Sequence, residues 1–301
     1  MRRLFIVVLC AAALLLTRTA FAGEGLTKVA DNVYSYLDVK TDTPQNSFAA
    51  NAGIVIGKDG VLVIDTLISA KEADRFIADI RKVTDKPIKY VVDTHYHLDH
   101  AFGNSEFAKL GATIISNEND RNNLIKEGES TLKDAKVLGL TEEDMRGTRV
   151  CLPTLTFTDR MKIDLGGETV ELIYVAPSHT SGSILVLVPG RKVLFTGDIL
   201  FNDYYPYVGE GDLEGWARCL DYIHTLDVTA IVPGHGPLST KKDAADMKDF
   251  LLAFDETARH LASKSSDVDV ITAELKKSLP PRSRGSWVMP FNVQEKYIQA
   301  K

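Results

Sequence analysis

The segment Thr94–His100 carries three imidazoles and one carboxylate in the pattern H-x-H-x-D-H. It directly follows an apolar, β-type run at Ile88–Val92. A strand that ends here would turn into a loop and point several of these side chains into one small volume. Imidazole and carboxylate are the ligands that divalent metals such as zinc prefer. The segment therefore predicts a metal site at the end of a strand rather than a solvated polar loop.

Three more metal-competent side chains follow apolar, strand-like runs beside glycine or proline. They are His179, Asp198 and His235. Taken singly they carry little weight, because a lone strand-end histidine is usually a hydrogen-bonded structural residue and Asp198 could cap a turn or helix. Together with the first motif they make five imidazoles and two carboxylates, more than one tetrahedral zinc can use. The set predicts a two-metal centre.

The hydrophobic pattern divides the remaining chain into two strand-rich halves, each with helices. We expect strands at 33–39, 52–56, 61–65, 88–92, 113–115, 161–163, 170–175, 184–188, 193–195 and 230–232. We expect helices opening at Ser69 and at 105–110, 118–138, 213–226, 241–261 and 271–279. This alternation predicts an α/β fold, a sandwich of two mixed β-sheets flanked by helices.

The first 22 residues have the features of an export signal. Arg2 and Arg3 precede the apolar run Leu4–Leu16, which is shorter than the roughly 20 residues that span a membrane. The sequence Ala20–Ala22 offers the small residues that a signal peptidase reads. We expect cleavage before Gly23 and a periplasmic or secreted protein with no stable membrane anchor. A short N-terminal anchor that is retained is the alternative.

The net charge argues against nucleic acid as a partner. Removal of Arg2, Arg3 and Arg18 with the signal would change the formal charge from −6 to −9. An acidic exported domain is a poor nucleic-acid binder, so we expect a small-molecule substrate.

The two cysteines outside the expected signal, Cys151 and Cys219, are too few for a disulfide scaffold. Whether they pair stays open, as does the oligomeric state. Residues 23–301 are expected to form one domain with a helical C-terminal segment from about 238.

In the order of its seven candidate ligands, the chain resembles the metallo-β-lactamase superfamily. The resemblance implies an αββα sandwich with the site at one edge, between the two sheets. The implied ligands are His95, His97 and His179 for the first metal and Asp99, His100 and His235 for the second. Asp198 would bridge the two metals. Asp65, which ends an early apolar run, would support the site from behind the ligands.

The residue at position 198 separates groups within that superfamily. The lactamases that named it carry cysteine or serine there, whereas aspartate is similar to glyoxalase II, the lactonases and exported members of unknown substrate. The resemblance therefore implies a dinuclear hydrolase with a bridging aspartate. The bond that it cleaves stays open among ester, lactone, thioester and amide, and the amides include β-lactams.

The functional prediction is an exported zinc-dependent hydrolase with two divalent metal ions. A hydroxide held by the two metals would be the nucleophile, and Asp99 would orient it and transfer its proton. The alternative is an oxidoreductase that resembles the persulfide dioxygenases, which use this fold with one iron on two histidines and an aspartate. Such a site has no use for His100 and His235.

The loop after Asp198 contains three tyrosines, Tyr204, Tyr205 and Tyr207. They are candidate substrate-binding residues, because rings beside a metal could form an aromatic wall and one phenol could donate a hydrogen bond to a developing oxyanion. The alternative is a loop that packs its rings on the edge of the sandwich.

Overall fold

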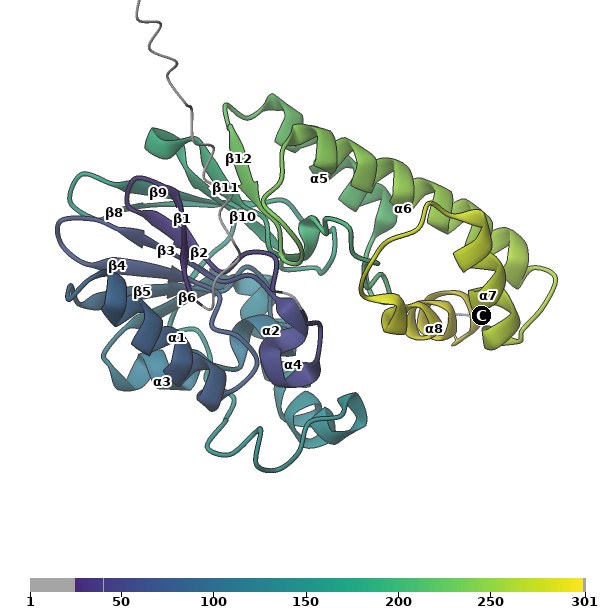
Figure 1. Cartoon of the computed structure of the whole chain (residues 1–301), viewed down its shortest axis with the longest axis horizontal. Helices are drawn as coiled ribbons and strands as arrows, with labels where there is room; N and C mark the ends of the chain where they lie inside the picture. Colours follow the sequence, from purple (N-terminus) through teal and green to yellow (C-terminus); the bar gives the residue numbers. More distant parts are fainter. Residues whose placement is uncertain (1–24, 40, 300–301) are drawn as a thin grey trace, which may run out of the picture.

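The computed structural model describes residues 25–39 and 41–299, so the expected export signal at 1–22 lies outside the described residues. Two β-sheets pack face to face, and helices cover the outer face of each (Figure 1). The first sheet has the order β1 (Thr27–Ala30), β2 (Val33–Ser35), β3 (Gly53–Ile56), β4 (Val61–Ile64), β5 (Ile88–Val92), β6 (Thr113–Asn117) and β7 (Leu155–Phe157). The second has the order β12 (Ala230–Val232), β11 (Val193–Phe195), β10 (Ile184–Val188), β9 (Thr169–Tyr174) and β8 (Arg160–Asp164). The predicted αββα sandwich is confirmed.

Both sheets are mixed, and the register of their parallel pairs positions the site. Strands β4 and β5 run parallel with Ile64 beside Val92, so the chain leaves both strands at the same level. Strands β11 and β12 run parallel with Phe195 beside Val232. Because the carboxyl ends of parallel strands share one edge of a sheet, polar residues that follow these four strands collect there.

The core lies in layers, as the alternation of the strands requires. Residues such as Leu62 of β4 and Val186 of β10 are fully buried between the two sheets. Helices α1 (Ala70–Val83) and α3 (Asn104–Lys109) cover the first sheet. The Ser69 side chain accepts a hydrogen bond from the backbone N–H of Glu72 and caps α1, as the sequence predicts.

The second sheet is covered by α5 (Leu213–Thr225) and α6 (Lys241–Ala262), which pack on each other. The remaining helical segments described are η1 (Pro44–Ala49), α2 (Leu98–Ala101), α4 (Glu118–Asp134), η2 (Ala135–Leu138), η3 (Pro189–Arg191), η4 (Gly197–Ile199), α7 (Val268–Ser278), η5 (Ser286–Val288), α8 (Met289–Asn292) and η6 (Val293–Gln299). Buried residues of the C-terminal helices α7, η5, α8 and η6 belong to one apolar cluster with buried residues of the second sheet. Within the described ranges, no helix combines the length and apolar character needed to cross a membrane.

Some local details differ from the sequence-based expectation. The strand expected at 33–39 ends at Ser35, because Asp38 has a φ of +52°, which no strand residue adopts. Strands β1 and β7 were not predicted, since they contain only four and three residues and lie at the edges of the sheet. Cys151 and Cys219 are free thiols and do not pair.

Candidate metal centre

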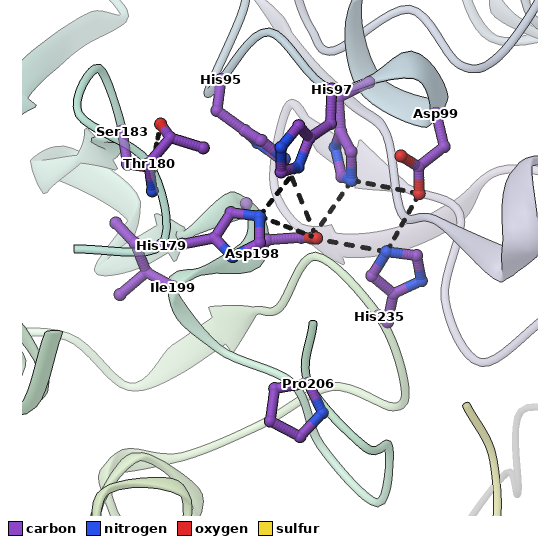
Figure 2. A network of polar contacts seen from close by, with 12 residues as sticks. His95, His97, Asp99, His179, Thr180, Ser183, Asp198, Ile199, Pro206 and His235 are labelled. Atoms are coloured by element: carbon purple, nitrogen blue, oxygen red, sulfur yellow. Dashed lines mark hydrogen bonds and ion pairs between the residues drawn. The ribbon is translucent and has the colours of Figure 1, made fainter. Parts of the chain in front are cut away.

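The fold brings all seven predicted ligands to one edge of the sandwich, where they form two groups. In the first group, ligand atoms of His95, His97, His179 and Asp198 lie within 4.8 Å of one another. In the second group, ligand atoms of Asp99, His100 and His235 also lie within 4.8 Å of one another. Figure 2 shows the side chains of His95, Asp99, His179 and His235 gathered around the Asp198 carboxylate. The division matches the one that the family resemblance implies.

Asp198 faces both groups, with one carboxylate oxygen toward each. Its Oδ2 lies 3.8 Å from His95 Nε2 and 3.5 Å from His179 Nε2. Its Oδ1 lies 3.1 Å from His100 Nε2 and 3.4 Å from His235 Nε2. This is the arrangement that a carboxylate needs to bridge two cations.

Several atoms at this centre are buried without a hydrogen-bond partner. They include His95 Nε2, and also His100 Nε2 and Asp198 Oδ1, which have only their mutual ion pair at 3.1 Å. Buried polar atoms in proteins are normally satisfied, so an unpaired set that faces one small volume indicates a ligand. Imidazole nitrogens and carboxylate oxygens are the donors of zinc and similar divalent ions. The residues therefore fit two such cations.

Hydrogen bonds on the far side of three imidazoles turn their Nε2 atoms toward the centre. His100 Nδ1 donates to Asp65 at 2.8 Å, and His235 Nδ1 donates to the Phe48 carbonyl at 3.0 Å. His95 Nδ1 lies 3.1 Å from the hydroxyl of Thr94. Partners of this kind fix the tautomer and orientation of a ligating histidine.

Asp65 lies behind the ligands, where the sequence places it. Besides His100, it accepts hydrogen bonds from the backbone N–H and the hydroxyl of Thr94, at 2.7 and 2.8 Å. One buried carboxylate thus joins the end of β4 to the first residues of the H-x-H-x-D-H loop.

His97 is oriented by a residue that the sequence analysis missed. Its Nδ1 lies 3.0 Å from His179 Nε2, and its Nε2 contacts Glu210 Oε1 at 2.5 Å. The Tyr96 hydroxyl donates to the same carboxylate at 2.8 Å. Burial raises the pKa of Glu210, but His97 lowers it more, to about 2, so Glu210 is ionised at neutral pH. Its only sequence signal is an acidic residue between Gly209 and Gly211 in the loop after Asp198.

The five imidazoles of the two groups differ in protonation. Burial lowers the pKa of His95 well below its usual value and that of His179 to about 3, so both are neutral, as metal binding requires. Burial also lowers the pKa of His100 and His235, but Asp198 raises both, His235 to about 9. Burial would raise the pKa of Asp198, yet His235 and His100 hold it well below its usual value. Burial lowers the pKa of His97 too, but Glu210 raises it above its usual value, so a cation in either group must displace protons.

A left-handed turn beside the centre holds His235. Ser47, Phe48 and Ala49 have φ values of +59°, +50° and +63°, a conformation that costs a non-glycine residue roughly 1–2 kcal/mol. The turn presents the Phe48 carbonyl to His235 and also to the Tyr204 hydroxyl, which donates at 2.8 Å. The local sequence gives no sign of this turn.

The three predicted tyrosines line a cavity of about 500 Å³ that also exposes Asp99, Asp198 and His235. Tyr204 and Tyr205 are almost fully buried, and the Tyr205 ring packs against Phe250. The hydroxyls of Tyr204 and Tyr207 donate to Phe48 and Glu295. The hydroxyl groups of Tyr204 and Tyr207 therefore already donate to protein acceptors, and the three rings form part of the cavity wall. Contact of any of them with a substrate stays a prediction.

Comparison with known proteins identifies the family and several relatives of this chain. A family model described as the metallo-beta-lactamase superfamily matches residues 46–235. A linear primary-alkylsulfatase from Pseudomonas sp. is 27% identical over 265 residues, which cover 75% of this chain and 49% of that protein. This chain therefore spans about half the length of that relative. A metallo-beta-lactamase type 2 from Bacteroides fragilis is 23% identical over 216 residues, which cover 70% of this chain and 78% of that protein.

The solved structure of a stereoselective inverting sec-alkylsulfatase from Pseudomonas sp. has a similar fold. It superposes with a TM-score of 0.67 at 20% identity, over 91% of this chain and 50% of that chain. The similarity therefore extends beyond the matched segment into the C-terminal helices.

The contacts of Asp65 lead to a first prediction, which concerns the free energy of unfolding in the absence of metal. Asp65→Asn keeps the shape but replaces one acceptor oxygen with a donor, so one of three buried donors loses its partner. We expect a loss of about 2 kcal/mol in the free energy of unfolding, measured by urea denaturation with a chelator present. The control is Asp59→Asn in an exposed turn, which should change it by less than about 0.5 kcal/mol. Equal values for the two variants would contradict the supporting role of Asp65.

Proposed function

The chain belongs to the metallo-beta-lactamase superfamily, and we propose that it is a hydrolase that uses two divalent metal ions, zinc foremost. The observation that carries the proposal is the position of Asp198, with one carboxylate oxygen toward each group of ligands. A single-metal centre would need neither the second oxygen nor the pair His100 and His235. Relatives named as an alkylsulfatase and a lactamase support the hydrolytic class.

Each group would hold one cation. His95, His97 and His179 would hold the first, Asp99, His100 and His235 the second, and Asp198 would contact both. When bound, the two cations would lower the pKa of a water toward neutrality and polarise the electrophilic atom of the substrate. The protein supplies a buried, preorganised donor set whose orientation depends on Asp65, Glu210 and the Phe48 carbonyl.

Asp99 is the residue proposed to move a proton. Its Oδ2 lies 3.2 Å from His235 Nε2, and its side chain keeps some exposure toward the cavity, unlike the fully buried His100. Burial would raise the pKa of Asp99, but His100 and His235 lower it below its usual value, so it is ionised and can accept a proton. A carboxylate at the boundary between ligands and cavity can orient a nucleophile and return the proton to a leaving group.

The bond that is cleaved is proposed at the level of class. Ester, lactone, thioester and amide bonds, β-lactams included, suit this centre, and the alkylsulfatase relatives add sulfate esters. Because the chain covers about half of that relative, sulfate-ester cleavage stays a second candidate. A hydrolysis panel on metal-loaded protein, with phosphodiesters included, separates these bonds. Metal analysis separates the hydrolase, with two zinc ions per chain, from the alternative one-iron oxygenase.

Asp198→Ala tests the bridging role. Removal of the carboxylate leaves the first cation on three histidines but deprives the second of charge and of its link to the first. We expect metal content to fall from two ions to one and turnover to fall by at least ~100-fold. The control is His260→Ala on α6, which is exposed and outside both groups and should keep most activity. Two retained metals with near-normal turnover would make Asp198 an ordinary turn residue.

Glu210→Gln tests the contact with His97. The amide keeps the size of the side chain but removes the negative charge that raises the basicity of the imidazole. We expect zinc affinity to fall by roughly tenfold, measured by competition with a chromophoric chelator. Glu214→Gln, an exposed change in the first turn of α5, is the matched control. Unchanged affinity in Glu210→Gln would show that the carboxylate does not act on the ligand.

We also propose export to the periplasm or beyond. Expression of the full chain in a bacterium should yield soluble protein that starts at Gly23, measured by intact-mass spectrometry. Membrane-bound material that retains Met1 would favour the retained anchor instead.

A further inference from the structure

The cavity beside the metal centre has an aromatic wall assembled from distant parts of the chain. Trp287 and Phe291 come from the C-terminal helices, Phe48 from the left-handed turn and Leu138 from η2. The rings of Phe48 and Trp287 have centroids 4.7 Å apart, and those of Trp287 and Phe291 are 6.3 Å apart, edge to face. None of these four side chains is a candidate metal ligand. Together they form a continuous apolar surface within the same cavity as Asp99 and His235.

Two of these side chains are exposed although they are large and apolar. Trp287 is 37% exposed and Phe291 is 42% exposed. A contiguous exposed apolar patch on a soluble protein commonly marks a binding site. An apolar group that entered the cavity would cover both rings.

Apart from the imidazoles of His97 and His235 at the metal centre, the charged residues that line the cavity are all acidic. Among the described residues that line it there is no lysine or arginine, but there are five carboxylates: Asp99, Glu127, Asp198, Glu210 and Glu295. Asp99 and Asp198 lie at the metal centre, where bound cations would offset them. An anion held elsewhere in the cavity would meet carboxylates and aromatic carbon without a cationic partner, which is unfavourable.

The three carboxylates away from the centre have partners of their own. Glu210 accepts from Tyr96 and contacts His97, Glu295 accepts from Tyr207, and Glu127 pairs with Lys126 at 2.6 Å. They are therefore not free to bind an ammonium group as their main partner. The cavity is best matched by a group that carries no charge.

We propose that this cavity takes the non-reacting part of the substrate, an uncharged acyl or alkyl chain, and rejects a chain that carries a negative charge. The inference rests on the proposed hydrolase function and specifies its substrate class. It concerns only the part of the substrate remote from the cleaved bond, since an anionic reacting group would lie at the cations. Each methylene that enters the apolar surface should raise kcat/KM by up to about fourfold.

Three 4-nitrophenyl esters test the proposal on metal-loaded protein: the acetate, the hexanoate and the adipate half-ester. The hexanoate and adipate acyl chains have equal length but differ in a terminal carboxylate. We expect kcat/KM for the hexanoate to exceed that for both of the others by at least ~10-fold. Trp287→Ala should lower the hexanoate-to-acetate ratio by about fivefold, and Trp287→Phe should restore most of it. The control is Leu252→Ala on α6, which is exposed and outside the cavity and should keep the ratio.

A second readout does not depend on turnover. The chain has two tryptophans, and Trp216 is fully buried, so a ligand in the cavity should change the fluorescence of Trp287. We expect 1-hexanol to change the emission of the metal-loaded protein at lower concentration than ethanol, which has the same hydroxyl but a chain shorter by four methylenes. The change should be lost in Trp287→Phe.

The outcomes separate this inference from the proposed function. Equal turnover of adipate and hexanoate esters would overturn the inference while the hydrolase proposal stands. If two-metal protein cleaved no ester, the proposal of ester hydrolysis would fail, and the fluorescence titrations would decide alone. Tighter binding of 1-hexanol than of ethanol would then support an uncharged-chain site, and equal binding of the two alcohols would overturn it.

Discussion

The arrangement of this protein depends on one buried carboxylate between two groups of imidazoles. Asp198 directs one oxygen toward His95 and His179 and the other toward His100 and His235. Burying such a charge is unfavourable unless opposite charge or a cation lies close by. In the described structure, protonated imidazoles of the second group supply that charge, and they are also the groups that a cation would replace.

The sandwich makes this concentration of polar groups tolerable by placing it where parallel strands end. The apolar residues of β4, β5, β11 and β12 stay in the core, and the chain becomes polar only as it leaves each strand. Around the centre, each contact restricts a rotation: Asp65 holds His100, the Phe48 carbonyl holds His235, and Glu210 holds His97. The orientation of these ligands is therefore set by protein contacts before any cation or substrate binds.

In the proposed function, the C-terminal helices connect the metal centre to substrate choice. They pack on the second sheet through an apolar cluster that contains Trp216 and Phe250, and they extend Trp287 and Phe291 to the cavity. The reacting end of the cavity is therefore set by residues of the sandwich, which the family model covers. Its apolar wall is set in part by residues 287 and 291, outside the matched segment 46–235.

The sequence by itself determined most element types, the αββα architecture and the seven candidate ligands, because periodicity and the H-x-H-x-D-H spacing are local properties. The family pattern placed Asp65 behind the ligands, and in the structure its carboxylate accepts hydrogen bonds from His100 and Thr94. Only the tertiary structure decided that Glu210 orients His97, that the Phe48 carbonyl orients His235, and that Trp287 faces the same cavity as Asp99. The first two contacts join residues 113 and 187 positions apart, and no local pattern encodes which distant groups a fold brings into hydrogen-bonding distance.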